Sequence, residues 1–170
     1  MPVWFLVEGD ADAEFIERII APAAALQIRI YRYARKPKQT RQAVIHSLHS
    51  METRYYILVD QNHRPCITAC RDHIREQFGQ VVDTSCIIVV ARSIEAWYLA
   101  GYTGTSPLLR GLAISTHTNS IDKQQFEQKI QAIRKSPTLA RSEMLNHYDL
   151  TYGRQRNRSL DYFCHKLGIP

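Results

Sequence analysis

The regular alternation of strand-like runs with helical patterns over the first 91 residues constrains the fold of this 170-residue chain most strongly. Runs of strand length lie at residues 3–7, 27–33, 55–59 and 86–91, and amphipathic helical patterns separate them. Such alternation is typical of βαβ units, whose strands form a mainly parallel sheet with helices on its faces. We therefore expect an α/β fold with a mainly parallel four-stranded sheet.

Two helices of the first half carry start and stop signals. Asp12 can cap a helix whose apolar residues recur at helical spacing until Pro22 ends or kinks it. A later helix is expected to begin near Pro65, to carry Ile67 on its apolar face and to end at Gly79. These signals place helices after the first and third strands.

The composition changes after residue 100. Residues 101–121 are rich in Gly, Thr, Ser and Asn, so they are expected to form a connector whose length makes it a candidate lid or binding loop. Two or three helices follow, at residues 122–135, 137–148 and 157–167. The expected organisation is a single domain over residues 1–170, with a βα core (1–100), a loop (101–121) and an added helical C-terminal part (122–170).

The chain carries a mild excess of positive charge, with 22 Lys plus Arg against 16 Asp plus Glu. This excess favours polyanion partners without requiring one. Basic residues gather between residues 29 and 41, where two tyrosines interleave them, and again between residues 154 and 158. Such patches can hold phosphates while tyrosines stack on bases, although a solvated surface explains them equally well. The predicted nucleic-acid contacts are Arg32, Arg35, Lys36, Lys38, Arg92, Arg154 and Arg156.

No targeting pattern marks the start of the chain, and its longest apolar run, at residues 86–91, is far shorter than a membrane-spanning helix. We therefore expect a cytoplasmic protein without a membrane partner. Its four cysteines are then expected to be reduced.

Acidic residues follow three of the predicted strands. Glu8 closes the first strand, Asp60 closes the third, and Glu95 begins a helix after the fourth. Ligands of open parallel sheets bind beyond the carboxyl ends of the strands, where carboxylates can hold a divalent cation against a phosphate. Acids at helix N-termini also simply favour the helix dipole, and this reading serves equally well for Glu95. Glu8 and Asp60 begin turns instead, which makes them the stronger functional candidates.

Three segments carry a resemblance to a known family. Residues 6–15 (LVEGDADAEF) resemble the first motif of Toprim-type domains, and residues 56–62 (YILVDQN) resemble their Asp-x-Asp motif. The chain is still more similar to the Toprim-like domain of unknown function 4276 family, found near prokaryotic defence genes, whose third hallmark is matched by residues 91–100 (ARSIEAWYLA). The resemblance spans most of the chain and implies a three-layer Toprim/Rossmann-like fold.

The same resemblance implies roles for individual residues. Glu8 would act as general acid or base, while Asp60 and Asn62 would hold Mg²⁺, or alternatively Mn²⁺, for phosphodiester chemistry. The chain departs from the pattern at Asn62, where active members usually carry a carboxylate. The amide oxygen of Asn62 can still bind a metal, but it brings no negative charge. Metal binding is then weak or lost unless Glu8, Asp10 or Glu95 supplies that charge. The predicted metal ligands are Glu8, Asp60, Asn62 and Glu95.

These observations leave three functions open. The leading hypothesis is a Mg²⁺-dependent phosphodiester-cleaving, nuclease-like protein acting on DNA or RNA, with a role in prokaryotic defence through the family resemblance. The alternative is a catalytically inert Toprim-like module that binds nucleic acid or a partner protein encoded by a neighbouring gene, and Asn62 favours it. A small-molecule phosphotransfer or nucleotide enzyme would use the acids but leave the basic runs unused. The oligomeric state stays open.

Overall fold

The chain folds as an α/β protein, as its alternating pattern predicts. The computed structural model describes residues 2–170, and its contacts divide them into a unit that ends at Val89 and a unit that begins at Val90. The first unit carries the sheet, and the second consists of helices and connecting loops. No helix within residues 2–170 combines the length and the apolar character needed to cross a membrane.

Four strands form one sheet in the order β2-β1-β3-β4. They are β1 (Val3–Val7), β2 (Ile28–Arg32), β3 (Tyr55–Asp60) and β4 (Ile87–Val90). The central strand β1 pairs in parallel with both β2 and β3, so that Leu6 lies opposite Tyr31 on one side and Ile57 on the other. The edge strand β2 exposes its arginines while its isoleucines are partly buried, because only one of its sides is paired. The predicted mainly parallel, four-stranded sheet is confirmed.

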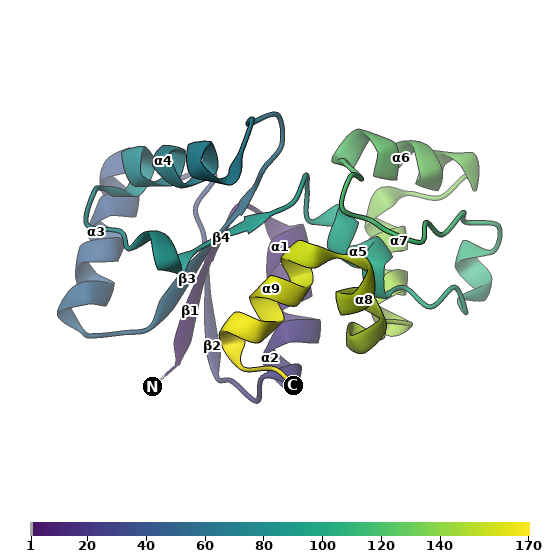
Figure 1. Cartoon of the computed structure of the whole chain (residues 1–170), viewed down its shortest axis with the longest axis horizontal. Helices are drawn as coiled ribbons and strands as arrows, with labels where there is room; N and C mark the ends of the chain where they lie inside the picture. Colours follow the sequence, from purple (N-terminus) through teal and green to yellow (C-terminus); the bar gives the residue numbers. More distant parts are fainter. Residues whose placement is uncertain (1) are drawn as a thin grey trace. The chain divides into compact units, whose positions relative to one another are not determined.

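Helices cover both faces of this sheet. Helices α3 (Lys38–Ser50) and α4 (Ile67–Phe78) lie on one side, and α1 (Asp10–Phe15) lies on the other (Figure 1). Beneath α3 and α4, Leu6 and Ile57 of the sheet form one buried apolar cluster with residues of the two helices. This cluster fixes the strands whose carboxyl ends carry the candidate acids.

The helix after β1 begins two residues before Asp12 and ends close to Pro22. Gly9 is the N-cap of α1, and Asp12 takes part in the capping box, with its Oδ2 accepting the Gly9 N–H at 3.0 Å. The helical segment continues through η1 (Ile16–Ile20) into α2 (Ala21–Ala23), so it ends one residue after Pro22. The wider π-helical winding of η1 ends at Ile20, two residues before the proline.

Helix α4 begins at Ile67 and not at Pro65, with Cys66 as its N-cap. Ile67 is 53% exposed, so the prediction that it faces the core is wrong. Its neighbours at residues 65–68 are also exposed, because the first turn of α4 extends beyond the buried cluster. Gly79 ends the helix as predicted, with a φ of 106°.

The second unit contains one α-helix and one short 3-10 helix more than the sequence predicts. Its helical elements are α5 (Glu95–Gly101), η3 (Pro107–Leu109), α6 (Lys123–Ala132), α7 (Pro137–Asn146), α8 (Leu150–Arg156) and α9 (Arg158–Leu167). The unpredicted α-helix is α8, which is short and contains Gly153, a residue that disfavours helix. Glycine is needed there because a Cβ on Gly153 would lie 3.1 Å from the Cα of Gly101 in α5.

Candidate functional site

The candidate site lies at the carboxyl edge of the sheet in the first unit. Strand β1 leads through α1 to β2, whereas its other neighbour β3 leads through α4 to β4, and α1 and α4 lie on opposite faces (Figure 1). Chain connections that leave adjacent parallel strands toward opposite faces open a crevice where ligands bind. Glu8 directly follows β1, and Asp60 is the last residue of β3. The two strongest sequence candidates therefore occupy the switch point of the sheet.

Tyr33, which follows β2, marks the point where the acids converge. Its phenol is 4% exposed and donates a hydrogen bond to the Leu58 carbonyl at 2.7 Å. Burial, reinforced by the negative charges of Glu8, Asp12 and Asp60, raises the pKa of Tyr33 well above its ordinary value. The phenol is therefore neutral, and three carboxylates lie within its electrostatic range. Tyr33 is part of the interior beneath the acids, not a surface ring for base stacking.

Arg41 of α3 fastens the loop that follows β2. Its guanidinium lies 5.6 Å from the centre of the Tyr33 ring and donates to the carbonyls of Ala34 at 3.1 Å and Lys36 at 2.9 Å. A third bond joins it to Gln77 of α4 at 3.0 Å. Since the loop leaves the carboxyl end of β2, Arg41 fixes it at the same edge as Glu8 and Asp60.

This fixed loop carries the exposed part of the predicted basic patch. Arg35 and Lys36 of the loop, and Lys38 at the first position of α3, are all exposed, so their charges are available to a polyanion. Arg32 is also exposed, but its Nε already donates to Asp10 at 2.7 Å. Arg92 belongs to the second unit, where it is exposed and adopts a left-handed backbone conformation with φ 64°.

The other two predicted contacts, Arg154 and Arg156, are held by the protein itself. Arg154 donates to Asp161 at 2.8 Å and to the carbonyl of Ile169 at 3.2 Å. Arg156 is only 5% exposed, which departs from the surface position expected for a phosphate contact. The physical reason is that the last carbonyls of α5 attract its cation, and Nη1 donates to Ala100 at 2.6 Å.

Asn62 lies in a tight turn directly after β3. Its side chain is exposed and its φ is 49°, a left-handed conformation that Asn tolerates better than most residues. The Arg64 N–H donates to the Gln61 carbonyl at 3.0 Å, and Arg64 Nη1 donates to the Asp60 carbonyl at 3.3 Å. The turn thus gives Asn62 a backbone role beside its predicted role as a ligand.

Glu95 lies in the second unit, at the first position of α5. It is 4% exposed, and its Oε1 lies 3.5 Å from Nη1 of Arg141 on α7. A buried carboxylate requires such a partner, because an isolated charge is costly to remove from water. The charge of Glu95 is therefore balanced by a residue of its own unit.

Three side chains at the carboxyl edge were missed by the sequence analysis as members of the site. Tyr33 and Arg41 belong to the basic run but act through burial and loop anchoring, which the sequence pattern does not reveal. Arg64 was missed altogether. Burial and the positive charge of Arg64 lower the pKa of His73 on α4, so this cation lies close enough to act on α4 as well as on Asp60. In the sequence, the one sign of this role for Arg64 is its position four residues after Asp60.

The donor set at this edge fits a hydrated Mg²⁺ ion. Mg²⁺ prefers oxygen ligands, keeps several waters and is commonly held by one or two carboxylates. Glu8 and Asp60 supply carboxylates, and Asn62 supplies an amide oxygen. Among residues 2–170, no group of three or more His, Cys, Asp or Glu side chains could hold a metal ion. A cation bound here would rest on the two carboxylates and keep several waters.

No family model, curated protein or solved structure matches this chain. The functional argument therefore rests on the geometry just described. Carboxylates on two adjacent parallel strands can hold a cation or move a proton, and the fixed basic loop can hold a polyanion beside them. The relation to Toprim-like proteins stays a prediction from the sequence.

Proposed function

We propose that this protein is a Mg²⁺-dependent, nuclease-like enzyme that cleaves phosphodiester bonds in nucleic acid. The observation that carries the proposal is the placement of Glu8 and Asp60 at the switch point, with a fixed basic loop at the same edge. In metal-dependent phosphodiester cleavage, carboxylates hold the cation at the reacting phosphate, and positive charge along the groove holds the neighbouring phosphates. Carboxylates and positive charge are both present within one unit of the chain.

Each residue has a distinct role in this proposal. Glu8 and Asp60 would hold the cation, with the amide oxygen of Asn62 beside them, and Glu8 would also accept a proton from the attacking water or donate one to the leaving oxygen. The cation, when bound, supplies electrostatic stabilisation of the charge that develops on the phosphate. Lys36 and the other exposed cations of its loop would orient the polyanion. Glu95 is left out of this set because Arg141 already balances its charge.

The resemblance to the Toprim-like domain of unknown function 4276 family supports the same class of reaction. It also extends the proposal to a cytoplasmic role in prokaryotic defence. That extension rests on the resemblance alone.

One observation favours a catalytically inert binding module as the second candidate. Asn62 occupies a left-handed turn position that its conformational tolerance explains, and it adds no negative charge to the edge. Glu8 and Asp60 would then shape a surface that binds nucleic acid or a protein without reacting.

A cleavage assay separates the two candidates. End-labelled single- and double-stranded DNA and RNA would be incubated with wild type, Glu8→Gln, Asp60→Asn and the control Glu127→Gln, each in Mg²⁺, Mn²⁺ or EDTA. Glu127 is an exposed acid on α6. We expect metal-dependent cleavage that falls about 100-fold or more in both site variants and is retained in the control.

Binding of the same nucleic acids, followed by fluorescence anisotropy, completes the test. An enzyme should retain binding in Asp60→Asn while losing cleavage. Absence of cleavage in every reaction, with binding that is insensitive to Mg²⁺ and to Asp60→Asn, would favour the inert module and contradict the proposal.

A further inference from the structure

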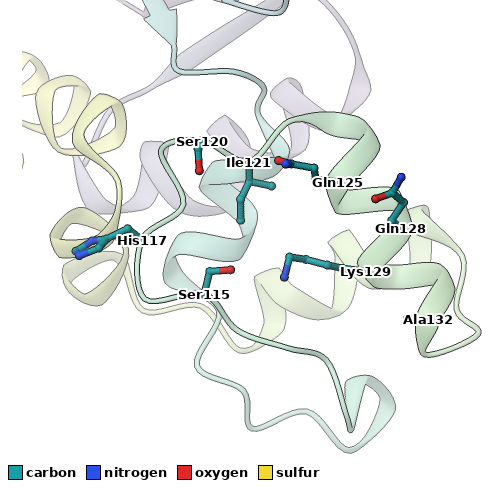
Figure 2. Close-up of a pocket in the computed structure, with 8 residues that line it drawn as sticks. All are labelled: Ser115, His117, Ser120, Ile121, Gln125, Gln128, Lys129 and Ala132. Atoms are coloured by element: carbon teal, nitrogen blue, oxygen red, sulfur yellow. The ribbon is translucent and has the colours of Figure 1, made fainter.

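An open pocket of about 520 Å³ lies in the second unit, between the loop at residues 115–121 and helix α6 (Figure 2). This volume falls within the range of roughly 300–1,000 Å³ that is typical of small-molecule sites. The residues that line the pocket include one lysine and no acid, so the lining carries a positive charge. It belongs to a different unit from Glu8 and Asp60, and the proposed function does not use it.

The polar groups of the pocket mainly offer hydrogen-bond donors. The ammonium group of Lys129 has three N–H donors, and it donates one long hydrogen bond to the Ala113 carbonyl at 3.4 Å. Figure 2 shows the polar ends of Lys129 and Ser115 turned toward each other. Gln125 contributes donors for a structural reason, because its Oε1 accepts the Asp122 N–H at 3.1 Å in the capping box of α6. Its NH₂ group is therefore the end left for a ligand.

The loop that forms one wall of the pocket is anchored by the buried Arg156. Arg156 Nε donates to the Thr116 carbonyl at 3.2 Å, and Nη2 donates to the Ser115 carbonyl. The Thr118 N–H donates a hydrogen bond to the Arg156 carbonyl at 3.1 Å, and Asn157 Nδ2 donates to Thr118 Oγ1 at 3.0 Å. A polar segment that the sequence marks as a candidate binding loop is thus held in one conformation.

Burial of the Arg156 cation is compensated by hydrogen bonds to backbone carbonyls and not by an opposite charge. Within residues 2–170, its guanidinium meets backbone carbonyls and the ring of Tyr152, 4.6 Å away, and forms no ion pair with a carboxylate. Removing a cation from water is expensive, and here the cation immobilises a surface loop. Ordering a binding loop before the ligand arrives lowers the entropy cost of binding. Such anchoring is what a preformed ligand site needs.

We propose that this pocket binds the phosphate group of a small organic molecule, with Lys129 as its ionic partner and Ser115, Ser120 and Gln125 as neutral donors. A phosphate group presents several acceptor oxygens to donors that arrive from different directions, and lysine serves it as a point charge. A carboxylate is planar and is matched best by the fork of an arginine, which the lining lacks. The volume leaves room for an organic body beside the phosphate.

Calorimetric titration of the full chain tests this proposal with adenosine monophosphate as the probe. Adenosine and inorganic phosphate are compared at constant ionic strength. We expect adenosine monophosphate to bind with a sub-millimolar Kd, inorganic phosphate to compete, and adenosine to bind about 10-fold more weakly or worse. Lys129→Gln should weaken binding of adenosine monophosphate by about 10-fold.

Lys123→Gln is the matched control, because Lys123 is exposed on the same helix and does not line the pocket. It should leave the affinity within about twofold of wild type. Equal losses in Lys129→Gln and Lys123→Gln would overturn the proposal. So would adenosine binding as tightly as its monophosphate, or no binding of either phosphate probe at millimolar concentration.

Discussion

At the scale of single residues, the buried cation Arg156 makes a testable contribution to stability. Replacing it with methionine keeps much of the side-chain volume but leaves four backbone carbonyls without their charged donor. We expect Arg156→Met to lower the free energy of unfolding by about 2–4 kcal/mol, as measured by urea denaturation. Arg158→Met, at an exposed position two residues on, should change it by less than about 0.5 kcal/mol. Equal effects would contradict the anchoring role.

Glu143 on α7 predicts a pH dependence of stability. Its Oε1 accepts the Ser106 hydroxyl at 2.6 Å, and this bond, with contributions from Asn146 and His147, lowers the pKa of Glu143. A lowered carboxyl pKa stabilises the fold above the ordinary glutamate value, and this stability is lost as the pH falls through the lowered folded-state pKa. The melting temperature of Glu143→Gln should therefore lie below that of wild type at pH 7, and the gap should close toward pH 3. A gap that stays constant over this range would show that ionisation of Glu143 is not the cause.

The site could be predicted only in part, because some of its residues are marked by their place at a strand end and others only by burial. Glu8 and Asp60 could be found because each ends an apolar strand, and the rule for parallel sheets places strand ends at one edge. Tyr33 and Arg41 could not be assigned, since their roles depend on burial beneath the acids and on carbonyls of a separate loop. Arg156 was placed on the surface because a sequence gives no measure of burial for an isolated arginine.

At the scale of elements, the crossing of α5 and α8 depends on two glycines. A Cβ on Gly101 would overlap the Tyr148 ring and lie 2.7 Å from the Asp149 carbonyl oxygen. Because backbone cannot move aside cheaply, Gly101→Ala should lower the free energy of unfolding by about 3 kcal/mol in chemical denaturation. Gly9→Ala, where the nearest atom would be 3.9 Å away, should cost no more than about 1 kcal/mol. A small effect at Gly101 would mean that the two helices can separate.

The loop after β2 predicts a salt-dependent contribution to nucleic-acid binding. Neutralising its exposed cations, as Arg35→Gln, Lys36→Gln and Lys38→Gln together, should weaken binding to duplex DNA. It should also reduce the slope of log affinity against log salt by about 2–3. Fluorescence anisotropy between low and moderate salt measures both quantities.

The control neutralises three exposed cations of the second unit, Arg110, Lys123 and Arg134. It should leave the slope close to that of wild type. An equal reduction in slope for both sets would indicate that net charge, and not the loop, governs binding.

The elements themselves were largely predictable where hydrophobic periodicity was strong. Strand β1 has the predicted bounds, and β3 is one residue longer than predicted. Helix α6 begins one residue later and ends three residues earlier than the predicted helix at residues 122–135. Helix α8 was missed because it is short and contains Gly153. The glycine lets the backbone approach Gly101 of α5 closely, and no local sequence pattern reveals this contact. Pro22 was expected to end or kink its helix, and the helical segment ends one residue later, at Ala23, after an unpredicted π-helical turn at Ile16–Ile20.

At the scale of the whole molecule, the two units carry different candidate sites. The first brings acids from two adjacent strands to one edge of a parallel sheet and fixes a basic loop beside them. The second places a positively charged pocket against an anchored loop. The net charge of +6 favours the approach of anionic ligands to either unit.

The central claim is that Glu8 and Asp60 together form a divalent-cation site. Its most direct test is a Mn²⁺ titration followed by electron paramagnetic resonance, with wild type, Glu8→Gln, Asp60→Asn and Glu127→Gln, each checked for folding by circular dichroism. The account predicts sub-millimolar binding in wild type and Glu127→Gln, and its loss in both site variants. Binding that is unchanged in the two site variants, or absent from wild type, would contradict it.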